Sequence, residues 1–312
     1  MNKKATFFID DVIWVFRDLT RERPASLWDN PYMAMLKKAY DEYGVKTQLN
    51  LFYRTCFWYG DDEFSLADMT DAYKKEFEEA SDWLKMGFHS KEEWPDYPFI
   101  NADYGLVDRV FKLIYNEVCR FAGEKSFAKA VVPHWIPMSE EGVKALSDNG
   151  IRITYASSGT KTDWGGDENA LPYGHSFRLL HNKKPESGVY KVETTDLPFT
   201  DALCSYNHLE EEDYAKIDGK IETIKDKKYD VYYMPKCQVV LNLILGEELA
   251  GELSKYTDDE FINIGDHEQY FYPDYYAYQP YYAESILTMG RMLKEAGYTF
   301  MFMEDLPTES GC

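Results

Sequence analysis

The sequence predicts an α/β fold, a distorted (β/α) barrel of seven or eight strands. One local pattern recurs: an amphipathic helix, a glycine near its C-terminus, and a short run of β-branched and aromatic residues. It appears from one end of the 312 residues to the other. Repeated helix, glycine and strand are typical of β/α units around a parallel sheet. Length and spread favour a barrel over an open sheet.

The pattern locates the elements in chain order. Helix ends closed by glycine are predicted at 36–44, 145–150 and 292–297, and 83–89 is a shorter fourth copy of the pattern. The sixth predicted strand has the weakest pattern. The predicted strands are 5–10, 46–53, 86–89, 129–134, 151–156, 189–194, 261–266 and 298–303.

Two polar stretches interrupt the alternation, at about 157–188 and 205–230. The first is rich in glycine and the second is densely charged. Neither has the apolar content of a separate core, so we expect loop decorations on a single domain covering 1–312. A split into two domains near 160 or 205 is the alternative that the length allows.

The chain is acidic, with 34 Lys plus Arg against 55 Asp plus Glu and a formal net charge of -21. Such a charge repels nucleic acid and anionic bilayers alike. No uncharged stretch is long enough for stable membrane insertion, and the basic first residues precede no signal-like apolar run. The five cysteines are widely spaced without a CxxC pair. These features predict a cytoplasmic protein with no nucleic-acid partner.

Reactive side chains gather at the ends of the predicted strands, where the site of a β/α barrel lies. Asp10 and Asp11 end the first strand, and adjacent carboxylates can serve as a base and a metal ligand. Three of the six histidines, His89, His134 and His267, also stand at strand ends. Imidazole and carboxylate are ligands for a metal such as zinc. The alternatives are a turn or helix cap for the aspartates and structural hydrogen bonds for the histidines.

Aromatic residues are dense at 270–282, directly after Glu268. Tyrosine rings can pack on the faces of sugars while their hydroxyl groups form hydrogen bonds. The alternative is that these rings pack the loop onto the barrel. The expected substrate contacts are Glu268, Tyr270, Tyr275, Tyr276 and, after the fourth strand, Trp135.

The segment 8–11 resembles the first motif, T-F-D-D, of the polysaccharide deacetylases of carbohydrate esterase family four and their divergent barrel relatives. The resemblance implies that Asp10 is the catalytic base and Asp11 a metal ligand. The segment beginning at His89 is similar to the second motif, H-[ST]-x-x-H, with Glu93 in place of the second histidine. The metal ligands would then be Asp11, His89 and either Glu93 or His134.

Two further motifs of the family are altered here. Residues 132–135 fall where the family carries R-x-P-[YF], whose arginine tethers the base and whose backbone helps to hold the oxyanion. No arginine stands there, and Arg54, at the end of the second strand, could substitute. Residues 264–267 are similar to the last motif, L-x-H, with one extra residue of spacing. This likeness implies that His267 is the general acid, although it could also be the third ligand.

The resemblance implies a metal-dependent carbohydrate hydrolase, most directly an N-deacetylase of an acetamido sugar or glycan precursor. Its cofactor would be a divalent metal, with zinc as the expected ion, and its partner a carbohydrate substrate. One alternative is a metal-independent glycosidase on the same barrel, using carboxylates such as Asp10 and Glu268. The other is a sugar-binding barrel without catalysis. The sequence specifies neither the sugar, its linkage and acyl group, nor the oligomeric state.

Overall fold

The computed structural model describes residues 3–55, 63–93, 98–99, 102–136, 138–158, 208–209, 211–234 and 237–308. Within these residues the fold is α/β with parallel strands, as predicted. The sixth predicted strand, 189–194, and nearly all of the predicted decoration at 157–188 lie outside the described residues. In the part of the chain that is described, no helix is both long and apolar enough to span a membrane.

Parallel pairing organises the strands into two main sheets. The six-stranded sheet has the path β10 (Val239–Val240), β11 (Phe261–His267), β1 (Lys3–Val12), β2 (Thr47–Phe52) and β3 (Leu84–Ser90), with β12 (Tyr298–Phe300) paired to β1. The second sheet contains β4 (Ala130–Val131), β5 (Ile153–Tyr155), β9 (Tyr232–Met234) and, antiparallel to β9, β8 (Ile224–Lys225). A smaller parallel pair joins β6 (Ser157–Ser158) to β7 (His208–Leu209). A parallel bridge between Met86 and Phe127 connects the regions of β3 and β4.

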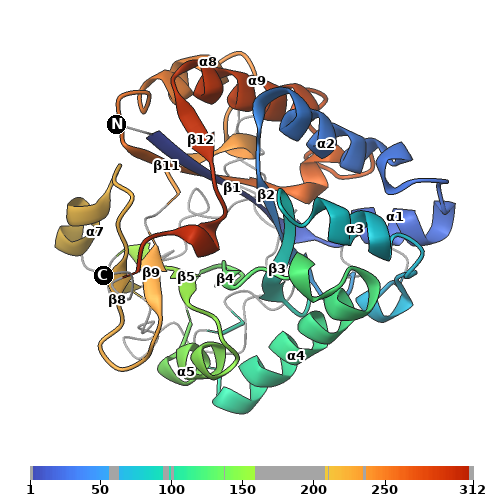
Figure 1. Cartoon of the computed structure of the whole chain (residues 1–312), viewed down its shortest axis with the longest axis horizontal. Helices are drawn as coiled ribbons and strands as arrows, with labels where there is room; N and C mark the ends of the chain where they lie inside the picture. The colour runs from blue at the N-terminus through green and yellow to red at the C-terminus, as the bar shows by residue number, and fades with distance from the viewer. Residues whose placement is uncertain are drawn as a thin grey trace.

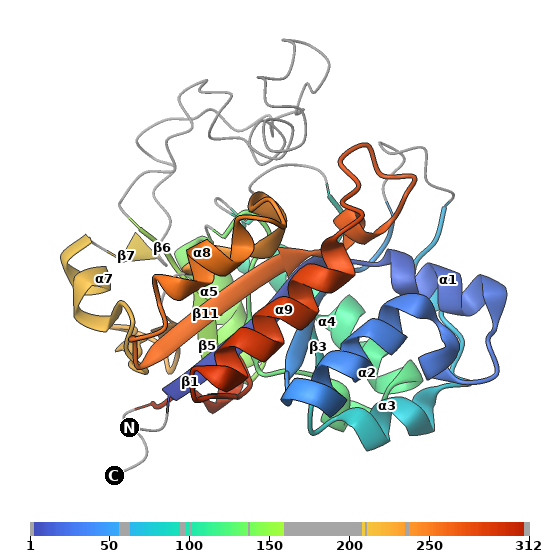
Figure 2. The ribbon, with the colours of Figure 1, turned by 90° about the horizontal axis from the view of Figure 1, so that it is seen from above.

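The helices lie outside the strands (Figure 1). They are α1 (Trp14–Glu22), α2 (Pro31–Tyr43), α3 (Lys74–Ala80), α4 (Tyr104–Phe121), α5 (Glu140–Asp148), α7 (Glu211–Ile217), α8 (Leu249–Ser254) and α9 (Tyr282–Glu295). In Figure 2, α8 and α9 lie alongside β11 and β1. Local sequence is sufficient to predict α2, because the Asn30 side chain caps its first N–H groups and Gly44 ends it at φ 73°.

Seven of the eight predicted strands are confirmed as β1, β2, β3, β4, β5, β11 and β12. The prediction missed β9, which pairs in parallel with β5. This strand has three residues, as β5 and β12 do, but it lacks the helix and glycine that directly precede those two strands in the sequence. The charged stretch before it, predicted as a decoration, contains α7 and the edge strand β8.

At 83–89 the sequence predicted a fourth copy of the pattern, a helix followed by glycine. This prediction is wrong. Residues Leu84–Ser90 form one strand, and Gly87 lies inside it. A Cβ at this position would lie 2.7 Å from Gln48 Nε2 and 3.0 Å from Asn50 Oδ1. The glycine therefore makes room for two buried amide side chains of the neighbouring strand.

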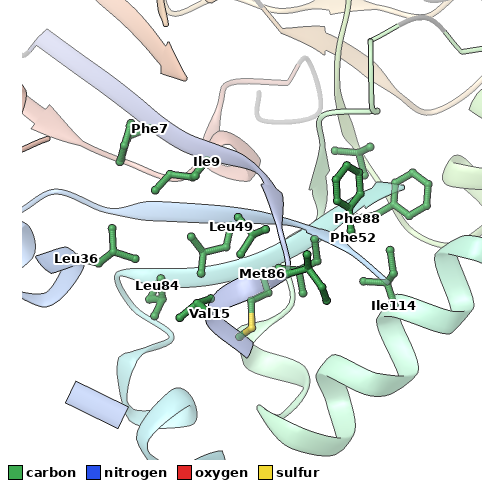
Figure 3. Packing of buried hydrophobic residues seen from close by; sticks show 14 of the residues in the cluster. Phe7, Ile9, Val15, Leu36, Leu49, Phe52, Leu84, Met86, Phe88 and Ile114 are labelled. Atoms are coloured by element: carbon green, nitrogen blue, oxygen red, sulfur yellow. The ribbon is translucent and has the colours of Figure 1, made fainter. Parts of the chain in front are cut away.

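The strands bury both of their faces. Successive strand side chains point to opposite sides. Phe7 and Ile9 of β1 belong to the larger apolar cluster shared with the helices (Figure 3). Phe8 belongs to a second cluster formed mainly by strand side chains, including Ala130, Val132, Ile153, Tyr155, Tyr232, Met234 and Phe261. A wall of parallel strands with apolar contacts on both faces is consistent with the predicted distorted barrel.

Glu268 fastens the beginning of α1 to the end of β11. The α1 helix has no side-chain cap of its own, and the Glu268 carboxylate accepts hydrogen bonds from the N–H groups of Ile13, Trp14 and Val15 at 2.7, 2.8 and 2.8 Å. Burial raises the pKa of Glu268 to about 8, although these three N–H groups lower it in part. Its side chain is fully buried. The structure thus places Glu268 at a helix terminus instead of in an open substrate site.

We predict that Glu268→Ala lowers the free energy of unfolding by about 3 kcal/mol, because three buried N–H groups lose their acceptor. Urea denaturation against Glu247→Ala, which removes an exposed carboxylate, is the measurement. Equal losses in the two variants would contradict the assigned role of Glu268.

Candidate metal centre

Three buried side chains meet at the ends of β1 and β3 and just after β4. They are Asp11, His89 and His134, whose ligand atoms all lie within 4.8 Å of one another. Asp11 Oδ1 is 3.0 Å from His89 Nε2 and 3.3 Å from His134 Nδ1. The two ring nitrogens are 3.1 Å apart. Asp11, His89 and His134, which was one of the alternatives for the third ligand, therefore surround a single point.

Backbone carbonyl groups orient the two imidazole rings. His89 Nδ1 lies 2.6 Å from the Val132 carbonyl oxygen, and His134 Nε2 lies 3.0 Å from the Glu93 carbonyl oxygen. A carbonyl oxygen only accepts, so each of these ring nitrogens carries a hydrogen. In the neutral rings, His89 Nε2 and His134 Nδ1 then hold lone pairs that face each other and the Asp11 carboxylate. Three acceptors converge, and only a cation between them can satisfy all three.

The donor set fits a divalent metal. Ligands about 2.0–2.1 Å from a tetrahedral zinc ion are about 3.3 Å apart, close to the three spacings seen here. Each histidine also has the backbone hydrogen bond that commonly orients a metal-binding ring. Asp11, His89 and His134 would hold the ion.

The site attracts positive charge, and the pKa shifts of His134 and Asp11 show this attraction for a proton. Burial opposes charge on His134, but the hydrogen bond and charge of Asp11 raise the pKa of His134 overall. Burial likewise opposes charge on Asp11, yet hydrogen bonds from His134 and His89 hold its pKa well below the usual range. The site therefore favours a carboxylate next to a positive charge.

The backbone is strained where it presents these ligands. Asp11 has φ 62°, and Trp135 and Ile136, directly after His134, have φ 59° and 75°. Such left-handed conformations are costly for residues other than glycine and often occur at functional sites. The β1–β2 register also shifts between Ile9 and Val12. This irregularity breaks the strand alternation and lets both Asp10 and Asp11 approach His89.

Asp10 and His267 lie side by side next to this centre. They are register partners in the parallel pair of β1 and β11. Asp10 Oδ1 accepts a hydrogen bond from Asn50 Nδ2 at 2.7 Å and lies 3.7 Å from His89 Nδ1. Burial raises the pKa of Asp10, although the charges of His89 and His267 oppose that rise. His267 Nδ1 lies 2.9 Å from Asn242 Oδ1, which orients the ring.

Glu93 and Arg54 lie in the same region with other contacts. Glu93 offers its backbone carbonyl to His134, and among the described residues its carboxylate is not a member of the metal-competent group. Arg54 forms a paired contact with Glu92, at 2.6 and 2.9 Å. The group that contacts Asp10 is Asn50, where the sequence suggested an arginine.

The predicted aromatic wall divides into buried and partly exposed rings. Tyr270 and Tyr275 are only 3% and 5% exposed, and their ring centroids are 5.1 Å apart. Tyr275 also packs on Trp14 of α1. These two tyrosines follow the packing alternative. Tyr276 is half-buried, and Trp135, also half-buried, has its ring centroid 6.1 Å from that of His134.

Sequence reasoning missed the amides Gln48, Asn50 and Asn242. Gln48 and Asn50 alternate with Leu49 and Leu51 in β2, and this period of two was an available signal. Asn242 lies in the short 3₁₀ turn Leu241–Leu243, where no periodic pattern marks it.

No protein-family model matches the chain, and no curated protein matches it in sequence. Among solved structures, the 4-α-glucanotransferase of Thermococcus litoralis is similar over 98% of this chain, with a TM-score of 0.54 and 11% identity. This chain spans 40% of that protein. At this identity the likeness concerns the fold alone.

Other similar structures include a polysaccharide deacetylase from Bacillus cereus, which aligns over 99% of this chain and 94% of its own, with a TM-score of 0.42 and 13% identity. A carbohydrate esterase family four pseudoenzyme from Bacillus anthracis aligns over 98% of this chain and 65% of its own, with a TM-score of 0.44 and 11% identity. Both TM-scores are below 0.5, so of these three structures we use the glucanotransferase to compare the fold.

We predict that long-range ¹H–¹⁵N spectra will show His89 protonated at Nδ1 and His134 protonated at Nε2. Zinc should shift the opposite nitrogens, His89 Nε2 and His134 Nδ1, because only those hold lone pairs toward Asp11. The same spectra of Asp11→Ala, which lacks one proposed ligand, are the control. The reverse tautomers, or zinc shifts at the carbonyl-bound nitrogens, would contradict the proposed donor set.

Proposed function

We propose that this chain is a metal-dependent carbohydrate hydrolase that removes the acetyl group from an acetamido sugar. The observation that carries this proposal is the convergence of three acceptor atoms, from Asp11, His89 and His134, on one buried point. The motif resemblance of residues 8–11 supports the assignment to an amide of a carbohydrate. We assign the metal to these three residues and place Glu93 behind His134, where its carbonyl orients the ring.

A divalent ion such as zinc, when bound there, supplies Lewis-acid chemistry: it polarises an amide carbonyl and lowers the pKa of water to about 7. Asp10 accepts the proton of the attacking water. Because Asn50 donates to Asp10 Oδ1, we assign the proton to the other oxygen, Oδ2. Burial raises the pKa of Asp10, which makes it a stronger base.

His267 completes the reaction by donating a proton to the leaving amine when the carbon–nitrogen bond of the amide breaks. Asn242 holds Nδ1, so the ring is oriented for transfer from Nε2. The products are acetate and the free amino sugar. We further propose Trp135 and Tyr276, the half-buried rings, as sugar contacts.

The glycosidase alternative loses support in this structure. It needs two carboxylates facing a glycosidic bond. Glu268, the suggested partner of Asp10, is fully buried and binds three N–H groups of α1. A sugar-binding barrel without catalysis is separated from the hydrolase by the activity experiment below.

We predict about one zinc ion per chain after purification with zinc supplementation. Asp11→Ala, His89→Ala and His134→Ala should each lower the bound zinc at least about tenfold, because each removes a direct ligand. Elemental analysis is the measurement.

Two matched variants control the metal measurement. Asp10→Asn and Glu93→Gln should keep the zinc, since Asp10 is assigned to proton transfer and the Glu93 carboxylate is not in the proposed ligand set. A wild type without zinc would refute the metal centre. Loss of zinc in Glu93→Gln would return Glu93 to the ligand set.

We predict that Asp10→Asn and His267→Gln lower acetate release from N-acetylglucosamine oligomers by about 10²–10⁴-fold while zinc is retained. Enzymatic assay of acetate is the measurement, with chelator-treated protein as the control. Activity that survives both chelation and Asp10→Asn would contradict the mechanism. Oligomer binding without any acetate release would support the non-catalytic alternative.

A further inference from the structure

A chain of buried side-chain amides runs through the strands to Asp10. Gln48 and Asn50 occupy alternate positions of β2 and are 1% and 0% exposed. Gln48 Nε2 donates to the Ala130 carbonyl at 2.9 Å and to Asn50 Oδ1 at 2.7 Å. Asn50 Nδ2 donates to Asp10 Oδ1 at 2.7 Å. The chain of hydrogen bonds thus connects β4, β2 and β1.

A backbone carbonyl sets the donor and acceptor direction of these hydrogen bonds. The Ala130 carbonyl oxygen can only accept, so Gln48 must turn its NH₂ group toward it. The second hydrogen of that group is directed at Asn50 Oδ1, which leaves Asn50 with only its NH₂ group for Asp10. The Ala130 carbonyl therefore fixes, through Gln48 and Asn50, which group donates to Asp10.

We propose that Gln48 and Asn50 are positioning residues that hold the base, Asp10, by one carboxylate oxygen. This rests on the proposed function, in which Asp10 is the base. A guanidinium group can bind both oxygens of a carboxylate, whereas one amide N–H binds a single oxygen. The amide pair therefore orients the carboxylate and keeps Oδ2 as the proton acceptor. Arg54, the cation suggested by the sequence, is paired with Glu92.

Two features show that the fold accommodates these hydrogen-bonded amides at a cost in stability. Gly87 is required, because a Cβ there would lie 2.7 Å from Gln48 Nε2, 3.0 Å from Asn50 Oδ1 and 3.4 Å from the Ala130 oxygen. Gln48 Oε1 is buried and has no hydrogen-bond partner among the described residues. A buried polar atom without a partner destabilises the folded state. Retention of such a costly arrangement is what a positioning role predicts.

The kinetic test compares Asn50→Leu with Asn263→Leu. Both replace a buried strand amide by a side chain of similar size, but Asn263 accepts from Thr6 and has no assigned role in the site. Asn50→Leu should lower kcat for acetate release from N-acetylglucosamine oligomers about 100-fold, with KM and bound zinc within about twofold. Asn263→Leu should keep kcat. Equal kcat in the two variants, or a loss confined to KM or zinc, would overturn the proposal.

A second variant covers the case in which Asn50→Leu does not fold. Gln48→Met keeps the length of the side chain and removes the donor, so it should lower kcat by a smaller factor than Asn50→Leu, because Asn50 remains. An unchanged kcat in Gln48→Met would show that the Ala130 end of the chain does not orient Asp10.

A spectroscopic test separates this proposal from the proposed function. In spectra of selectively ¹⁵N-labelled Asn and Gln side chains, Asp10→Ala should shift the Asn50 amide and speed its hydrogen exchange, while the Gln48 amide stays protected. An Asn50 amide that does not respond to Asp10→Ala would overturn the positioning role. If the wild type releases no acetate, the proposed function fails, and this spectrum still decides whether the amide chain holds Asp10.

Discussion

The left-handed backbone at Asp11 is the constraint on which the rest of the site depends. At φ 62°, beside the register shift of β1, this residue turns its carboxylate toward His89 and His134 while Asp10 stays beside them. A regular strand would send the two carboxylates to opposite faces. The helix α1 begins three residues later, and Glu268 binds its first N–H groups. The strained backbone at Asp11 is therefore held between β1, which pairs with its neighbouring strands, and α1, whose first N–H groups bind Glu268.

The site uses neutral groups to orient charged ones. Backbone carbonyls of Val132 and Glu93 fix the rings of the two candidate metal ligands. Side-chain amides fix the reacting groups, Asn50 on Asp10 and Asn242 on His267. None of these orienting groups carries a charge. The charge of the buried centre is therefore set by the aspartates, Glu93, the histidines and any bound ion.

The buried side chains inside the wall of strands are of two kinds, apolar and polar. Phe8 and its neighbours form an apolar cluster, whereas Gln48, Asn50, Thr6 and Asn263 are polar and buried. Apolar residues at these polar positions would bury more hydrophobic surface and leave no unpaired oxygen at Gln48. Gln48 and Asn50 are linked to Asp10, whereas Thr6 donates to Asn263 away from it. The chemistry at the strand ends thus accounts for Gln48 and Asn50.

The sequence by itself determined the α/β alternation and seven strands, because periodicity and helix-ending glycines are local features. It placed Asp11, His89 and His134 at strand ends, but it left the third ligand open among Glu93, His134 and His267. It could not assign β9, because no helix and glycine lead directly into this three-residue strand. Tertiary structure alone decided burial and partners: Glu268 and Tyr275 are residue types that suit a sugar site, but α1 and Trp14 cover them. It also decided that Asn50 holds Asp10, since the two residues lie on different strands and meet only when those strands pair.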